Sequence, residues 1–180
     1  EIPKISNNLN GNKNVQVEII TGDYLDYSSP IAPKNSWANN KKNDVAVWII
    51  RLDSNGNFSI PNTKSGAKRN LYVLKGSNME IDGQSISGGS MVTLDSSKNT
   101  AIKNLGSKTK ILMLQGVPIN EPVVKYGPFV MNTRSEIEQA FYDYNRTEFG
   151  GWKWGNSDPV HGIEKEKFAK LINGNIIKPS

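Results

Sequence analysis

The chain has 180 residues, and its 22 lysines and arginines against 17 aspartates and glutamates give a formal net charge of +5 at pH 7. It has no cysteine and a single histidine, His161, which excludes disulfides, thiolate metal sites, cysteine nucleophiles and any site needing two imidazoles from this chain. The lysines are scattered, so nucleic-acid binding is not expected, and no apolar run reaches the roughly 18 residues of a membrane helix, so we expect a soluble chain.

Short strand-like segments separated by turns dominate the first two thirds of the sequence. Their apolar residues alternate with polar ones or form brief β-branched runs, at residues 15–19, 45–50, 58–60, 71–74, 79–81, 91–94, 101–102 and 111–114. The near-continuous apolar run at 45–50 predicts a strand that is covered on both faces. Asn55-Gly56 and Asp82-Gly83 each predict a hairpin turn. This spacing indicates an all-β fold, an antiparallel sandwich or barrel.

A helix is predicted after residue 130. Thr133 and Glu136 have the spacing of a capping box, in which each side chain bonds the backbone amide of the other residue. The apolar stripe that follows consists of Ile137, Ala140, Phe141 and Tyr144. We expect the helix to end near Asn145, before the breaker Phe149-Gly150-Gly151.

The last thirty residues carry weaker signals. Trp152 and Trp154 alternate in what we expect to be an extended segment, and residues 164–171 predict a short helix with Phe168 and Leu171 facing inward. The sequence therefore divides into a β-barrel over residues 1–130 and a helical tail over 131–180 that packs on a barrel.

The search for catalytic side chains gives few candidates. His161 with Asp158 could belong to a serine–histidine–aspartate triad, but a turn residue in 158–162 is the favoured interpretation. The carboxylate pairs Glu80 with Asp82 and Asp23 with Asp26 could do acid–base chemistry, although solvated turns or strand edges are favoured.

Two further groups could bind a ligand. The tryptophans could stack on a sugar, but Trp48 lies within an apolar strand and is expected in the core, and packing is favoured for Trp37, Trp152 and Trp154. The cations of 64–69 could hold an anion, with a solvated loop favoured.

Residues 114–133, LQGVPINEPVVKYGPFVMNT, closely resemble the C-terminal signature of the pirin family. The resemblance continues through the helix at 136–141, then 143–144, 149–150, 158–162 and 167–169, and residues 1–3 and 28–31 look like the opening of the same half. Pirins are tandem cupins, so the resemblance implies a jelly-roll barrel, or double-stranded β-helix, with a C-terminal helix and tail. It covers the family's C-terminal half, and the N-terminal half is not in this sequence.

In the pirin family the metal, usually iron, is held in the N-terminal barrel by three histidines and a glutamate. Aligning the cupin pattern His-x-His, Glu and Tyr-Val-Leu-x-Gly on residues 72–76 puts Asn62 and Lys64 at the histidine positions and Lys68 at the glutamate position. A protonated lysine offers a metal no lone pair. The resemblance therefore implies no metal and no cofactor in this chain, with iron only in the absent half.

Three hypotheses about function follow from the resemblance and the residues. The leading one is a metal-free cupin domain with a structural and protein-interaction role beside a metal-binding N-terminal cupin. The second makes the chain part of an iron-dependent quercetin 2,3-dioxygenase whose active site lies in the missing half. The third is a module that binds a small ligand or carbohydrate at the barrel mouth. We expect no catalytic residue in this chain itself.

The interaction surface is expected around residues 121–133 and the helix after them. Its candidate residues are Glu121, Tyr126, Phe129, Phe141, Trp152 and Trp154. The expected partner is the N-terminal cupin half, of the same protein or another, and a homodimer is left open. Without a visible signal peptide, and given the resemblance, we expect a cytoplasmic protein.

Overall fold

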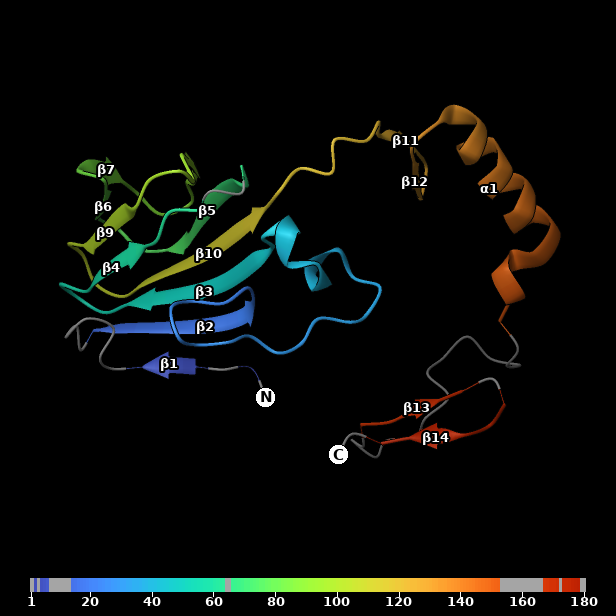
Figure 1. The fold of residues 1–180 in the computed structure, drawn as a ribbon, viewed down its shortest axis with the longest axis horizontal. Helices are drawn as coiled ribbons and strands as arrows, with labels where there is room; N and C mark the ends of the chain where they lie inside the picture. Colours follow the sequence, from blue (N-terminus) through green and yellow to red (C-terminus); the bar gives the residue numbers. More distant parts are fainter. Residues whose placement is uncertain are drawn as a thin grey trace. The chain divides into compact units, whose positions relative to one another are not determined.

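The computed structural model describes residues 2, 4–6, 14–63, 66–152, 167–171 and 173–178. It divides into two compact units, residues 1–120 and 121–180. The first unit contains two antiparallel sheets, and the second contains a hairpin, a helix and a short strand pair (Figure 1). No helix in the described part of the chain is long and apolar enough to cross a membrane.

The first unit has the expected all-β architecture. Its six-stranded sheet has the order β1 (Lys4–Ser6), β2 (Val15–Thr21), β3 (Ala46–Leu52), β10 (Thr109–Gly116), β5 (Lys68–Lys75) and β8 (Met91–Leu94). The four-stranded sheet has the order β4 (Asn57–Ile60), β9 (Thr100–Asn104), β6 (Met79–Ile81) and β7 (Gln84–Ile86). Two 3₁₀ turns, η1 (Trp37–Asn39) and η2 (Lys41–Asn43), precede β3.

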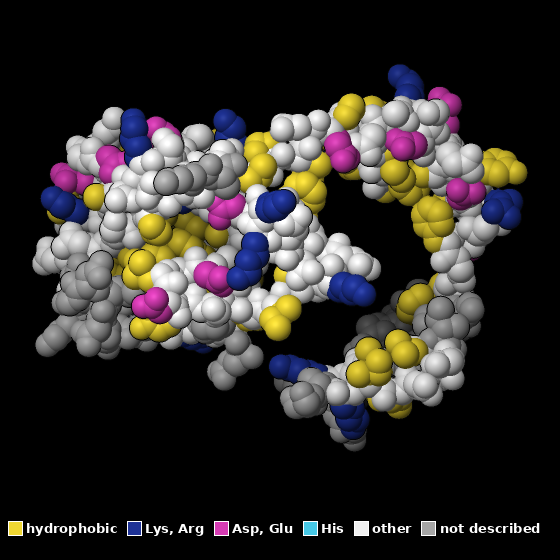
Figure 2. All heavy atoms as spheres, in the orientation of Figure 1, with side chains coloured by type: hydrophobic (Ala, Val, Ile, Leu, Met, Phe, Trp, Pro, Cys, Tyr) yellow, Lys and Arg dark blue, Asp and Glu magenta, His cyan; other side chains and the backbone are white. Residues whose placement is uncertain are grey.

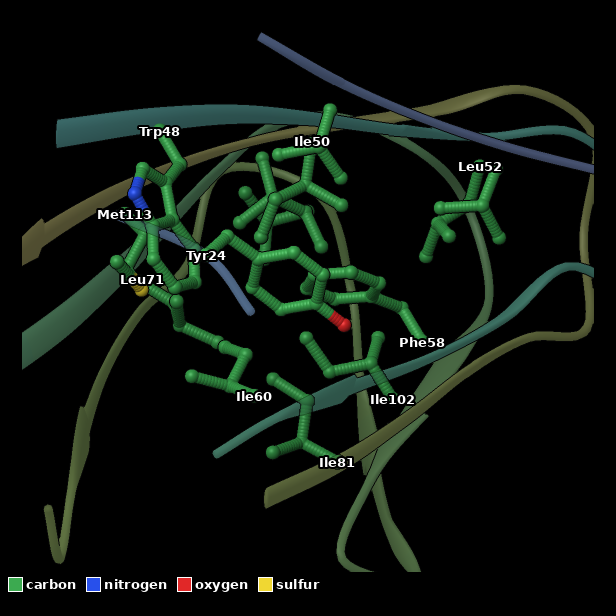
Figure 3. Packing of buried hydrophobic residues seen from close by; sticks show 14 of the residues in the cluster. Tyr24, Trp48, Ile50, Leu52, Phe58, Ile60, Leu71, Ile81, Ile102 and Met113 are labelled. Carbon is green, nitrogen blue, oxygen red and sulfur yellow. The ribbon is translucent and has the colours of Figure 1, made fainter. Parts of the chain in front are cut away.

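The core lies between the two sheets. Trp48, Ile50, Leu71 and Met113 of the six-stranded sheet face the smaller sheet, which contributes the side chains Phe58, Ile60, Ile81 and Ile102 (Figure 3). Tyr24, from the loop after β2, enters the same cluster and stacks on Phe58, with ring centroids 5.3 Å apart. Buried polar atoms here are paired, since Tyr24 Oη donates to the Ser59 carbonyl and Trp48 Nε1 to the Gly22 carbonyl.

Two strand-level expectations differ from the structure. β3 is not covered on both faces, because its inward residues are buried while its outward residues are only half-buried. Asn55-Gly56 forms a turn, with Asn55 at φ 61°, but not a hairpin. β3 pairs with β2 and β10, whereas β4 pairs with β9, so this turn carries the chain from one sheet to the other. The Asp82-Gly83 hairpin is confirmed, joining β6 to β7 with both residues at positive φ.

The second unit contains the hairpin of β11 (Val124–Tyr126) and β12 (Phe129–Met131), then α1 (Arg134–Thr147) and η3 (Glu148–Gly150). The hairpin packs on α1, so the structure divides the chain after residue 120 rather than after 130. The predicted helix and its capping box are confirmed. Within the stripe Ile137 and Ala140 are buried, Phe141 is half-buried and Tyr144 is exposed.

The helix predicted over 164–171 is wrong where the structure describes it. Ala169–Lys170 form β13, which pairs with β14 (Ile176–Ile177), and this pairing prevails over the helical spacing of the apolar residues. Phe168 and Leu171 are 36% and 44% exposed instead of facing inward. Residues 164–166 lie outside the described residues.

Asn104 is a fully buried amide that joins the turns at one end of the first unit. Its Nδ2 donates to the carbonyls of Leu52, at 3.1 Å, of Asp53, at 2.9 Å, and of Ser107. Its Oδ1 accepts from Gly106 N and from Thr109 Oγ1, at 3.2 and 3.0 Å. Several backbone groups therefore depend on this one side chain.

Asn104→Asp should destabilise the first unit by about 3 kcal/mol or more, because an acceptor would then face carbonyl oxygens at nearly unchanged volume. Urea unfolding followed by tryptophan fluorescence, to which the buried Trp48 contributes, measures the loss. Asn99→Asp is the matched control, since the hydrogen bond that its Oδ1 accepts from Asn62 N, at 2.8 Å, survives the change. Equal losses in the two variants would contradict this role for Asn104.

The start of α1 should be sensitive to acid. Hydrogen bonds from the side chain and backbone of Thr133 hold the pKa of Glu136 below its ordinary value. A carboxyl whose pKa is lowered by folding stabilises the fold above its unfolded pKa, about 4.3, and this contribution is lost as pH falls through the folded value.

We therefore expect wild-type α1 to lose helical circular dichroism between about pH 5 and about pH 3, and Glu136→Gln to show a smaller acid-dependent loss. Glu138→Gln, an exposed glutamate on the same helix, should behave as the wild type does. The idea fails if Glu136→Gln and Glu138→Gln have superimposable pH profiles.

Candidate functional site at the Arg69 end of the barrel

Arg69 is the most unusual buried side chain of the first unit. On β5 the inward positions alternate with outward ones, and Leu71 and Val73 are buried in the core. Counting back by two places Arg69 on the same inward face, where it is only 2% exposed. Lys68 is exposed, on the opposite face. A buried cation in an apolar barrel needs hydrogen-bond partners to be tolerated.

The partners of Arg69 come from both sides of β5. Nε donates to Gln115 Oε1 on β10 at 2.7 Å, and Nη2 donates to the carbonyl of Pro61 at 2.9 Å. Gln115 Nε2 in turn donates to the Asp44 carbonyl, at 3.2 Å, while Thr63 Oγ1 donates to the Asp44 carboxylate. The guanidinium therefore links β5, β10 and two loops at this end of the barrel.

The charge of Arg69 is only partly compensated. Burial lowers the pKa of the guanidinium from its ordinary value, and the carboxylate of Asp44 acts in the opposite direction. Nη1 is buried and has no hydrogen-bond partner among the residues that the structure describes. The group stays a cation at neutral pH because the ordinary pKa of arginine is so high.

These residues do not fit a metal ion. A side chain that ligates a metal inside the barrel must face inward, and the inward positions of β5 hold Leu71, Val73 and Arg69, whose guanidinium has donors and no acceptor. Asn62 and Lys68, which match metal-ligand positions that this chain is expected to have lost, are both exposed, and Lys64 lies outside the described residues. No three acidic or histidine side chains gather at any point within the described ranges.

The remaining sequence candidates take ordinary structural roles or fall outside the description. Asp82 Oδ1 accepts from Ala101 N at 2.7 Å, and Asp23 Oδ1 accepts from Ser29 N at 3.1 Å, so one carboxylate of each candidate pair holds a turn or loop in place. His161 and Asp158 lie outside the described residues.

The tryptophans differ in their surroundings. Trp48 is buried in the core, as expected. Trp37, on η1, is 45% exposed in the first unit, and Trp152 is 56% exposed in the second. Trp154 lies outside the described residues. Apolar side chains pack together in the interior of the barrel, so a sugar would not bind at its centre (Figure 3).

Three residues of the expected interaction surface, Tyr126, Phe129 and Phe141, lie together in the second unit. Phe141 of α1 meets Tyr126 and Phe129 of the hairpin edge to face, with centroids 5.7 and 4.9 Å apart. Phe149, which was not expected here, contacts Phe129 and Tyr144. We call these five rings the aromatic face. Hydrophobic side chains gather over the hairpin and the adjoining helix in the space-filling view (Figure 2).

The other expected members of this surface are placed differently. Glu121 Oε2 accepts from Asn132 Nδ2 at 3.0 Å, which ties the segment before β11 to the start of α1. Tyr126 remains 65% exposed and Phe149 60% exposed although their rings pack together with the others. Most large aromatic groups bury more of their surface, so this face is suited to further contacts.

Comparison with known proteins identifies the family. The sequence profile described as the pirin C-terminal cupin domain matches residues 47–150. A Vibrio cholerae protein provisionally named a quercetin 2,3-dioxygenase is 35% identical over 77% of this chain and 43% of its own length. Human pirin is 27% identical over 83% of this chain and 48% of its own length.

A solved structure shares the fold. The crystal structure of quercetin 2,3-dioxygenase from Acinetobacter baumannii superposes with a TM-score of 0.68 and 26% sequence identity, covering 83% of this chain and 48% of that one. The chain thus spans less than half the length of each of these relatives. It has the all-β cupin fold and belongs to the pirin family, in which it corresponds to the C-terminal cupin domain.

Proposed function

We propose that this chain is a metal-free cupin domain that supports a metal-binding N-terminal cupin half and presents a surface to it. The observation that carries the proposal is Arg69, whose guanidinium takes an inward-facing position of β5 and offers no lone pair to a metal. The cluster of buried apolar side chains in the core supports the proposal, because a metal cupin needs lone-pair donors around an open coordination position. The expected cytoplasmic location belongs to the same proposal.

The proposal assigns catalysis to the other half. The names of the Vibrio and Acinetobacter relatives favour a second candidate, in which the longer protein is an iron-dependent quercetin 2,3-dioxygenase. In that protein the present chain would contribute packing and no metal ligand. The two candidates therefore agree on the chemistry of this chain and differ on the activity of the whole.

Metal loading tests the chemistry of this chain directly. After incubation with ferrous iron and desalting, we expect the chain to retain no stoichiometric iron and to consume no flavonol, because a guanidinium cannot donate a lone pair. Elemental analysis and flavonol absorbance measure the two outcomes. A longer protein that includes a histidine-bearing cupin half is the positive control for iron, and its flavonol turnover separates the two candidates. Retention of one iron per chain by the isolated domain would overturn the proposal.

We expect the N-terminal cupin half to bind at the aromatic face. Tyr126 is exposed at the edge of this face, where its ring contacts Phe141. Tyr142 is 63% exposed on the same helix as Phe141, yet it takes part in none of the ring contacts found in the described residues. The two tyrosines form a matched pair, because they are similarly accessible but only one belongs to the face.

Tyr126→Ser should weaken binding to a separately produced N-terminal cupin half by about tenfold, because buried tyrosines are common energetic centres of interfaces. Tyr142→Ser should bind as the wild type does. Isothermal titration calorimetry gives both affinities, and circular dichroism confirms that α1 is intact in each variant. Equal affinities for the two variants would move the interface away from the aromatic face.

A further inference from the structure

A row of cations crosses the outer face of the six-stranded sheet. Arg51 of β3 lies directly opposite Lys110 of β10, and Lys110 lies directly opposite Lys75 of β5. Gln16 of β2 extends the row on the other side of Arg51. These four strands are neighbours in the sheet (Figure 1), so the side chains follow one line across it.

An irregularity in β5 creates part of this row. Ile111 lies opposite Val73, but the next residue, Lys110, lies opposite Lys75, so Leu74 is skipped. Simple alternation would put Lys75 on the same face as the buried Val73. The bulge instead leaves both Leu74 and Lys75 exposed and puts Lys75 beside Lys110.

The cations of the row are unequally compensated. Arg51 Nη1 lies 2.9 Å from Glu18 Oε1, and the nearby Lys108 Nζ lies 3.6 Å from Asp53 Oδ1. Lys75 and Lys110 have no acidic side chain within ion-pair distance in the described part of the chain. Like charges directly opposite each other on adjacent strands destabilise a sheet. The ammonium groups of Lys75 and Lys110 therefore repel each other, and a bound anion would reduce this repulsion.

A groove follows the row. It has a volume of about 430 Å³, and Arg51, Lys75, Lys108 and Lys110 line it together with Asp53. That volume is typical of a site for a small molecule. The buried Asn104 holds the carbonyls of Asp53 and Ser107 on either side, so both turns that border the groove are fixed before any ligand arrives.

We propose that this groove binds a small molecule with two or more linked phosphate groups. Adjacent strands are about 4.8 Å apart, so the row from Arg51 to Lys75 spans about 10 Å, more than one phosphate can contact. Lysines, which act as point charges on phosphate oxygens, supply the cations that lack an acidic partner. The one arginine of the row, Arg51, has a planar fork that suits carboxylate and phosphate alike, and it is already paired with Glu18.

The first measurement compares anions on the full chain at low salt by isothermal titration calorimetry. We expect tripolyphosphate to bind about tenfold more tightly than orthophosphate, because it reaches several cations at once. Its binding should weaken as potassium chloride is added. Citrate, with carboxylates in place of phosphates, should bind more weakly than tripolyphosphate. Equal affinity for citrate would overturn the assignment to phosphate, and equal affinity for orthophosphate would overturn the multivalent site.

Lys110→Gln should have effects of opposite sign on binding and on stability. We expect tripolyphosphate affinity to fall by about tenfold, while the melting temperature without anion stays the same or rises because the repulsion with Lys75 is gone. Lys34→Gln removes the same charge from an exposed loop that does not line the groove, and should change neither quantity. Equal loss of affinity in the two variants would show general attraction to a basic protein and overturn the site, as would a lower anion-free melting temperature for Lys110→Gln.

Discussion

The two-residue alternation of β3, β5 and β10 is the constraint on which the rest of the structure depends. Inward positions on these adjacent strands supply much of the core, including Ile50, Leu71 and Met113. The same alternation places Arg69 in the interior, and it places Arg51 and Lys110 on the outer face. A shift of one residue in any of these strands would expose apolar side chains and bury a lysine or an arginine, so the register is strongly specified.

This constraint determines what chemistry the barrel can do. A cupin that uses a metal needs lone-pair donors on inward positions around an open coordination position. Here the interior holds apolar groups, and the inward cation Arg69 is hydrogen-bonded to Gln115 and Pro61. Through these hydrogen bonds the guanidinium stabilises the end of the barrel, and its positive charge repels cations. Both proposed binding sites therefore lie outside the barrel interior, the aromatic face in one unit and the cationic groove in the other.

The sequence predicted best the features that are decided by neighbouring residues. The capping box of α1 and the Asp82-Gly83 hairpin depend on side chains a few positions apart, and both formed as expected. The turn at Asn55-Gly56 and the strand at Ala169–Lys170 depend on distant pairing partners, which local patterns do not reveal. Arg69 is different, because counting back by two from Leu71 and Val73 would have placed it inward, whereas motif spacing alone selected Lys68.

The row of cations on the outer face could not be predicted from the sequence. Arg51, Lys75 and Lys110 are separated by more than twenty residues from one another and become neighbours only through the pairing of β3, β10 and β5. The bulge at Leu74 then adds a second non-local condition, because without it Lys75 would face the core. Since the pairing of β10 with β5 sets Lys110 opposite Lys75, these two lysines are held near one another whether or not an anion is present. Because the two lysines repel each other when no ligand is bound, phosphate binding in the groove would also increase the stability of the barrel.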